Sequence, residues 1–223
     1  MHVVQPLPGD AHSEIIPMAH LRRPLQQALA FNTVVLVVEI LGGISANSLS
    51  LVMDGVHNLS DELAIAFLVV AYTRTTGISS GWLRAANLLN SVGLLGVCGW
   101  LTWRALGRLV QPIVVLGWVP IIAGVIGAAC NWAVAWVLRS PSRENPSIRL
   151  AYVHNLGDTF VSLVPVLAGV LTLLTRNMVV DPLLSLVIAV IIVVSTVPVV
   201  LGSHRELLWP ERVICGGPPA ARR

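Results

Sequence analysis

The sequence predicts an all-α membrane protein that crosses the bilayer six times. The chain has 223 residues, of which 55% are apolar and 11% charged, and its mean hydropathy is +0.80. A soluble domain has roughly 25% charged residues. Six apolar stretches approach or exceed the helix of about 20 residues that spans a hydrocarbon core. They lie at residues 29–44, 51–73, 84–106, 113–137, 148–174 and 179–201.

Short connections join these stretches, so we expect one compact bundle of antiparallel neighbours. The first stretch is the shortest, and its helix is expected to begin a few residues earlier. The expected organisation is a transmembrane domain between two cytoplasmic tails, at residues 1–28, 29–203 and 204–223. The first tail lacks the pattern of a signal peptide, and the second is too short for a folded domain.

The arginines indicate how the bundle is oriented. All 14 basic residues are arginines, and only Arg104, Arg108 and Arg176 fall on one side of the six expected helices. The positive-inside rule therefore predicts that both termini are cytoplasmic. The net charge of +3 reports this topology, so we expect a lipid bilayer and no nucleic acid as partner. A bacterial cytoplasmic (inner) membrane is the expected location.

Two similar pentapeptides lie inside apolar stretches: His57-Asn-Leu-Ser-Asp61 in the second and His154-Asn-Leu-Gly-Asp158 in the fifth. Residues four apart share one face of a helix, so each motif presents an imidazole and a carboxylate together. From the helical rise, Asp61 and Asp158 each lie about 15 Å from a helix end, near the middle of the bilayer. The sequence therefore predicts one shared site of two nitrogens and two oxygens.

This ligand set suits Zn²⁺, which binds imidazole and carboxylate at about 2.0–2.2 Å. Mn²⁺ or Mg²⁺ would favour an all-oxygen site, and Cu(I) would favour sulfur ligands. We expect Zn²⁺ as a substrate, with Co²⁺, Cd²⁺ or Fe²⁺ as alternatives, and no resident cofactor. The alternative is a purely structural polar cluster. It is less favoured because an unpaired charge inside a membrane costs about 3 kcal/mol.

Further polar residues are candidates for a second shell or a proton relay. Asp54 lies three residues before His57 on the same helix face, nearer the outer surface, where a residue wetted at the interface is an equal alternative. Asn58 and Asn155 each follow a motif histidine directly, and Glu39 lies in the first stretch. Any of these three could instead hold neighbouring helices together. Pro120, Pro165 and Pro198 could kink helices four, five and six.

The pattern resembles the cation diffusion facilitator family, over roughly residues 29–201. Several segments match it in order and spacing through the first two helices, and the fifth-helix motif matches as well. The matching segments are Glu39-Ile-Leu-Gly42-Gly43, Ser48-Leu-Ser-Leu, Asp54-Gly-Val-His57-Asn-Leu-Ser-Asp61, His154-Asn-Leu-Gly-Asp158, Asp181-Pro182-Leu-Leu-Ser, and Gly127 with Asn131.

The resemblance implies six helices with cytoplasmic termini and a metal site of His57, Asp61, His154 and Asp158. It implies a secondary transporter, not an enzyme, that exports zinc-like ions in exchange for protons. Members usually continue into a cytoplasmic C-terminal domain that supports dimerisation, which this chain is expected to lack. A homodimer would then form through transmembrane helices.

The ligands themselves suggest how exchange could work. An imidazole with an ordinary pKa near 6.5 can trade a proton for a metal ion at physiological pH. We expect alternating access by rocking of helices. A rival is a membrane metal-binding or sensor subunit that does not transport. An intramembrane metallohydrolase is a weaker rival, since the sequence contains no His-Glu-x-x-His motif.

Overall fold

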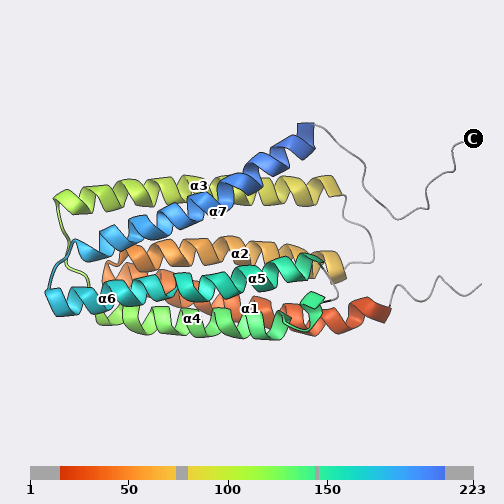
Figure 1. Ribbon diagram of the computed structural model, residues 1–223, viewed down its shortest axis with the longest axis horizontal. Coiled ribbons are helices and arrows are strands. Elements are labelled where there is room, and N and C mark those ends of the chain that lie inside the picture. Colours follow the sequence, from red (N-terminus) through yellow and green to blue (C-terminus); the bar gives the residue numbers. More distant parts are fainter. Residues whose placement is uncertain (1–15, 74–79, 144–145, 209–223) are drawn as a thin grey trace, which may run out of the picture.

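The computed structural model describes residues 16–73, 80–143 and 146–208, and over these it is a bundle of six long helices (Figure 1). One of the six is interrupted and is labelled as two elements. A short 3-10 helix, η1, occupies Pro141–Arg143. The elements are α1 (Ile16–Ala46), α2 (Leu49–Thr73), α3 (Ser80–Val110), α4 (Trp118–Leu138), α5 (Pro146–Val161) with α6 (Leu163–Thr175), and α7 (Val180–Leu208).

Successive long helices run antiparallel, so α1 begins and α7 ends at the same end of the bundle (Figure 1). We call this the inner end. At the opposite, outer end, short connections join α1 to α2, α3 to α4, and α6 to α7. The turn after α1 is made by Asn47, which adopts a left-handed conformation with φ of 56°. Asparagine tolerates this conformation and commonly ends helices.

The outer faces of these helices are apolar, as a bilayer requires. Large side chains such as Leu89 and Trp103, both 75% exposed, point away from the bundle. Four segments are long and apolar enough to cross a membrane: Arg23–Ala46, Trp118–Leu138, Ile148–Thr175 and Val180–Pro198. Helix α2 is also long enough, at 25 residues, but Asp54, Asp61 and Glu62 lower its hydropathy. The expected polytopic six-helix fold is confirmed.

The helix boundaries differ from the expected ones at several places. Helix α3 is longer than expected at both ends, and α7 continues to Leu208, into the segment expected to be the C-terminal tail. Helix α1 begins at Ile16, so it extends into the segment expected to be a tail; residues 1–15 and 209–223 lie outside the described residues. Helix α4 begins at Trp118 because residues 111–117 cross the outer end without helical structure. The fifth helix is interrupted at Ser162, between α5 and α6.

The interruption at Ser162 has a cause in the sequence. Pro165 has no amide hydrogen, so the carbonyl of Val161 loses its helical partner and the helix breaks there. Pro120 causes no such break, because it lies in the first turn of α4 where the amide needs no helical partner. Pro198 lies inside α7, which is continuous around it.

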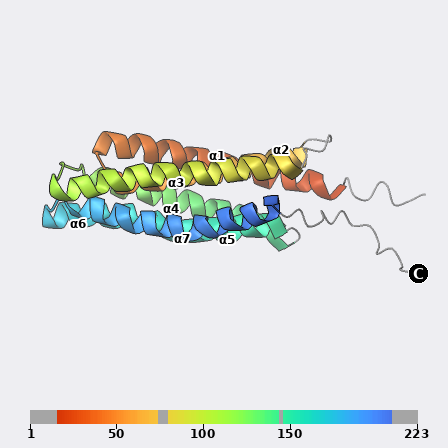
Figure 2. The same cartoon turned by 90° about the horizontal axis from the view of Figure 1, so that it is seen from above.

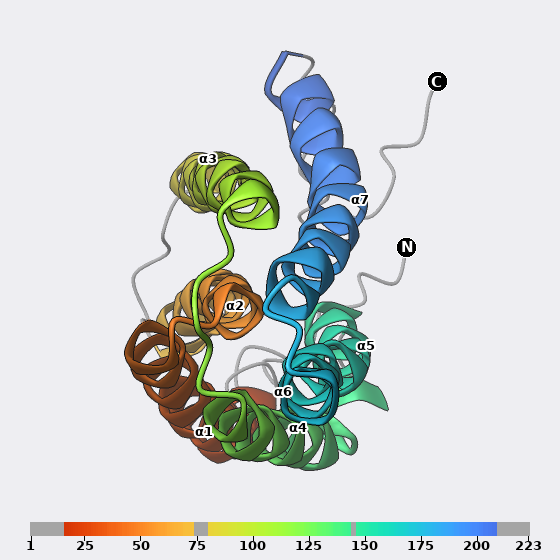
Figure 3. The ribbon, with the colours of Figure 1, turned by 90° about the vertical axis from the view of Figure 1, so that its left-hand side faces the viewer.

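Helices α3 and α7 pack together on one side of the bundle and meet the remaining helices mainly through α2 and α6 (Figures 2 and 3). A cluster of buried apolar residues joins α2, α3 and α7, and includes Met53, Cys98 and Ile188. A second cluster lies where α1, α2, α4 and α5 meet, and includes Leu25, Ile65 and Leu138. The bundle therefore has two packed regions that share α2.

Glycines bring α4 and α6 close together. A side-chain carbon at Gly124 would lie 2.8 Å from the carbonyl oxygen of Ser162, and one at Gly169 would overlap the carbonyl oxygen of Gly117. Small residues let membrane helices approach closely, since packing rather than hydrophobic burial holds them together. This contact fixes the interrupted helix, and hence the fifth-helix motif, against α4.

The start of α2 is fixed by Asp181, a fully buried residue at the start of α7. Its carboxylate accepts hydrogen bonds from the hydroxyls of Ser48 and Ser50, each at 2.6 Å, and from the amide of Leu49 at 2.6 Å. A carboxylate at a helix N-terminus satisfies free amides and complements the helix dipole. Asp181 thereby sets the position of the helix that carries His57.

Candidate metal centre

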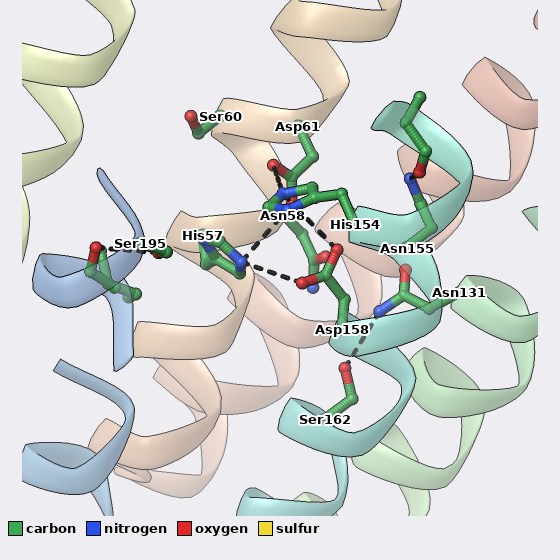
Figure 4. Close-up of polar contacts among 12 residues, drawn as sticks. His57, Asn58, Ser60, Asp61, Asn131, His154, Asn155, Asp158, Ser162 and Ser195 are labelled. Carbon is green, nitrogen blue, oxygen red and sulfur yellow. Dashed lines mark hydrogen bonds and ion pairs between the residues drawn. The ribbon is translucent and has the colours of Figure 1, made fainter. Parts of the chain in front are cut away.

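Helices α2 and α5 bring the two pentapeptide motifs together. His57, Asp61, His154 and Asp158 each offer one ligand atom, and these four atoms lie within 4.8 Å of one another (Figure 4). Because the helices are antiparallel, the histidine of one motif faces the aspartate of the other. Counting from the inner end, Asp61 and His154 form a first pair, and His57 and Asp158 form a second pair.

The distances within this cluster suit a tetrahedral ion. Nε2 of His154 lies 2.7 Å from Oδ1 of Asp61, and Nε2 of His57 lies 3.1 Å from Oδ1 of Asp158. Within α2, Nε2 of His57 lies 3.8 Å from Oδ2 of Asp61. Within α5, Nε2 of His154 lies 3.7 Å from Oδ2 of Asp158. Ligands about 2.1 Å from a tetrahedral zinc ion are separated by about 3.4 Å. The spacing of four residues between the histidine and the aspartate of each motif thus produces a cluster that could bind an ion after small side-chain movements.

Burial differs between the two pairs. The side chains of the second pair are each about 5% exposed, whereas His154 in the first pair is 39% exposed. Along α5, His154 is also the ligand candidate nearest the inner end. The cluster is therefore closed around His57 and Asp158 and most open beside His154.

Several polar atoms in the cluster lack a hydrogen bond to any described residue. Oδ2 of Asp61, Oδ2 of Asp158 and Nδ1 of His57 are buried and make no hydrogen bond there. The basic partners found for both carboxylates in the described part are the two histidines, which carry a positive charge only when protonated. Leaving carboxylate oxygens unpaired inside a membrane is costly, and a bound cation removes that cost.

The four residues expected around the cluster take different positions. Nδ2 of Asn58 donates to Oε2 of Glu39 at 2.6 Å, and both side chains are buried. Asp54 is 1% exposed and lies close to Glu39. Asn155 instead donates to the carbonyl of Ala151 in its own helix, so its amide group does not reach the cluster. Asp54, Asn58 and Glu39 therefore lie together, and Asn155 lies apart.

One residue of this region was not expected from the sequence. Ser162 is fully buried, and its hydroxyl accepts a hydrogen bond of 3.1 Å from Nδ2 of Asn131 on α4 (Figure 4). It lies four residues after Asp158, so it continues the helix face of the fifth-helix motif. That spacing would have indicated it, but a single serine in a membrane helix is usually a packing residue.

A multi-pass membrane bundle with a buried His/Asp cluster on two of its helices has the features of a metal-ion transporter. The chain belongs to the cation efflux family: the sequence model of the cation efflux transmembrane domain matches residues 25–208. This confirms the resemblance seen in the motifs. The family comprises transporters rather than enzymes, and the protein is a multi-pass integral membrane protein.

Curated relatives cover most of this chain. It is 30% identical to zinc transporter ZitB of Escherichia coli over 212 residues, which is 89% of this chain and 68% of the relative. It is 28% identical to the cadmium, cobalt and zinc/H(+)-K(+) antiporter of Bacillus subtilis, over 80% of this chain and 61% of the relative. A proton-coupled zinc antiporter of Mus musculus is 27% identical over 80% of this chain and 54% of its own length. The chain thus spans between about half and two thirds of these relatives.

Proposed function

We propose that this protein exports a divalent cation, preferably Zn²⁺, in exchange for protons at a bacterial cytoplasmic membrane. The observation that carries this proposal is the cluster of four ligand atoms within 4.8 Å on two antiparallel helices. The names of the relatives support it, since they describe zinc, cadmium and cobalt transport and proton coupling. Zn²⁺ is preferred because two imidazoles and two carboxylates match its ligand chemistry.

The proposed exchange follows from the cross-helix pairs. Metal binding requires imidazoles without their second proton, so an arriving ion displaces protons. When the ion leaves, a protonated His154 can donate to Asp61, and a protonated His57 can donate to Asp158. These are charge-assisted hydrogen bonds, and the distances of 2.7 and 3.1 Å support them. Protons and the metal ion would thus satisfy the same carboxylates in turn.

The side from which the ion enters is proposed to be the inner end. His154 is the most exposed ligand candidate, while Asp181 holds the start of α2 at the outer end. Release to the outer side then requires the outer contacts of α2 and α7 to change. Two-sided opening around one fixed site is the general behaviour of secondary transporters.

Zinc flux into proteoliposomes under an imposed pH gradient tests this proposal. We expect gradient-driven flux with the intact chain and its loss with Asp158→Ala, while the control Asn155→Ala retains it because that amide bonds its own helix. Flux that ignores the pH gradient would contradict proton exchange. Zinc binding without flux, lost in Asp158→Ala, would favour a metal-binding or sensor subunit instead.

A further inference from the structure

The facing residues of α2 and α5 continue one step beyond the metal centre. From the inner end, α2 presents Asp61, His57 and Asp54, and the other helix presents His154, Asp158 and Ser162. The first two steps are the pairs measured above. The same antiparallel register places Asp54 and Ser162 together as a third pair, about 5–6 Å nearer the outer end. The contacts of Asp54 include Ser162.

This third pair lies in a buried group of oxygen atoms. Glu39 of α1 and Asn131 of α4 complete it, and each of these four side chains is at most 1% exposed. Both carboxylate oxygens of Asp54, Oε1 of Glu39 and Oδ1 of Asn131 form no hydrogen bond of acceptable geometry with any described residue. The group therefore presents several oxygens and, unlike the metal centre, no nitrogen ligand.

A glycine makes room for this group. A side-chain carbon at Gly127 would overlap Oε1 of Glu39 and would lie 3.5 Å from the hydroxyl of Ser162. The Glu39 carboxylate thus occupies the space that any other residue at Gly127 would fill. Since α4 contacts α1 extensively, the space at Gly127 allows the Glu39 carboxylate of α1 to lie toward the face of α5.

The charges in this group are not balanced by the described residues. The donor found for Glu39 is the neutral amide of Asn58, and the described part of the chain contains no arginine ion pair with Glu39 or Asp54. The nearest basic side chain along α2 is His57, which belongs to the metal centre. Two adjacent buried carboxylates cannot both stay charged and unpaired, so either a proton or a bound cation must neutralise them.

We propose that Glu39, Asp54 and Ser162 form a second cation site, the outer oxygen site, which binds a divalent metal ion more weakly than the metal centre. Oxygen ligands alone favour hard ions such as Mn²⁺, and for Zn²⁺ they replace the preferred imidazoles. An ion that leaves the metal centre outward would meet this weaker site next. Multi-site binding that is weak enough to release the ion favours passage. Binding here does not depend on transport, but this role as an exit step rests on the proposed function.

Mn²⁺ binding followed by electron paramagnetic resonance tests the site, with the full chain in detergent. The metal centre is first disabled by Asp61→Asn with His154→Ala, the pair farther from the outer oxygen site. We expect this variant to bind one Mn²⁺ with a Kd of about 10⁻⁴–10⁻³ M, the range of weak oxygen sites. Adding Asp54→Asn or Glu39→Gln should weaken that binding at least about tenfold, because even the loss of an outer-shell partner typically costs about 10–100-fold in metal affinity.

One further variant and two controls separate loss of the site from loss of the fold. Gly127→Ala removes no ligand but displaces the Glu39 carboxylate, so it should weaken Mn²⁺ binding. Its matched control is Gly96→Ala, where a side-chain carbon meets no described atom within 4 Å. Glu62→Gln is a second control, because that carboxylate bonds Thr33 instead. Both controls should bind Mn²⁺ as before.

Two results would overturn the second site. If the variant without the metal centre binds no Mn²⁺ at millimolar concentrations, the two carboxylates hold only a proton. If Mn²⁺ binding survives the combination of Asp54→Asn and Glu39→Gln, the ion lies elsewhere. Neither result affects the zinc flux test with Asp158→Ala, so failure of this site and failure of the proposed transport are distinguishable.

Discussion

Glycines have opposite surroundings in two regions of this bundle. On α4 and α6, and in the residue just before α4, they lie at contacts where an added carbon would come within 3 Å of a backbone or side-chain atom of the facing helix. On α3, the described glycines have no other atom within 4 Å of such a carbon. The first set is Gly117, Gly124, Gly127 and Gly169, and the second is Gly93, Gly96, Gly99 and Gly107.

These surroundings indicate which helices hold the site in place. Close backbone approach makes α1, α4 and α6 a tightly packed frame, and Glu39, Asn131 and Ser162 are attached to it. Helix α3 instead joins α2 and α7 through side chains, including apolar contacts of Leu94 and Leu101. We infer that α3 can shift relative to the frame more easily than α4 can.

The largest expected loss of unfolding free energy comes from adding a side chain where the helices of the frame approach most closely. Gly169→Ala places a carbon against the carbonyl of Gly117, a backbone atom that cannot rotate away. Overpacking of this kind costs about 1–3 kcal/mol, and we expect the upper part of that range. Unfolding in mixed detergent micelles measures the change. An unfolding free energy equal to that of the intact chain would show that the frame is not tightly packed.

A smaller loss is expected where α2 meets α7. Asp181→Ala removes the carboxylate that accepts hydrogen bonds from the hydroxyls of Ser48 and Ser50 and from the amide of Leu49. These buried donors then lose their acceptor. Each unsatisfied donor costs about 1–3 kcal/mol, and partial rearrangement of the two hydroxyls should keep the total near 2 kcal/mol. Hydrogen exchange should increase at the first amides of α2 but not at the α4–α6 contact. Equal increases at both places would contradict two separately packed regions.

The link between α2 and α3 should matter less. Nδ2 of Asn90 donates to both the carbonyl and the hydroxyl of Ser60, each at 3.0 Å. Hydrogen bonds between membrane helices contribute about 0.6 kcal/mol on average, so Asn90→Ala should lower the unfolding free energy by about that amount. The distribution of distances between spin labels on α3 and α4 should broaden in this variant. An unchanged distance distribution would show that apolar packing alone holds α3.

The motif spacing of four determined much of this site in advance. It placed His57 with Asp61 and His154 with Asp158, and antiparallel neighbours then required the cross-helix pairs. The contact of Asn58 with Glu39 was not predictable, because it depends on how α1 and α2 rotate against each other. The same spacing did not identify Ser162, since a hydroxyl carries no charge that would make its burial unusual.

The fold shows the same division between local pattern and packing. Hydropathy predicted six crossings. Of the three prolines expected to allow a kink, Pro165 coincides with an interrupted helix, whereas α4 and α7 are continuous at Pro120 and Pro198. A start of α1 a few residues before residue 29 was expected, but not one as early as Ile16, because Arg22, Arg23 and Pro24 interrupt the apolar pattern while the helix continues through them. The different roles of the glycines also depend on neighbours that one sequence does not reveal: Gly96 and Gly124 look alike until the facing helix is known.

The smallest effect is therefore expected at α3, and it tests the comparison most sharply. Gly96→Ala adds a carbon that meets no described atom within 4 Å, so no contact opposes it. Alanine favours a helix over glycine by up to about 1 kcal/mol, and a membrane should reduce this gain because backbone hydrogen bonds are already enforced there. We expect an unfolding free energy unchanged or slightly raised, against the clear loss with Gly169→Ala in the same assay. A loss as large as that of Gly169→Ala would mean that the α3 glycines also face a close partner, which a second copy of the chain could supply. Dependence of that loss on protein concentration would identify such a partner.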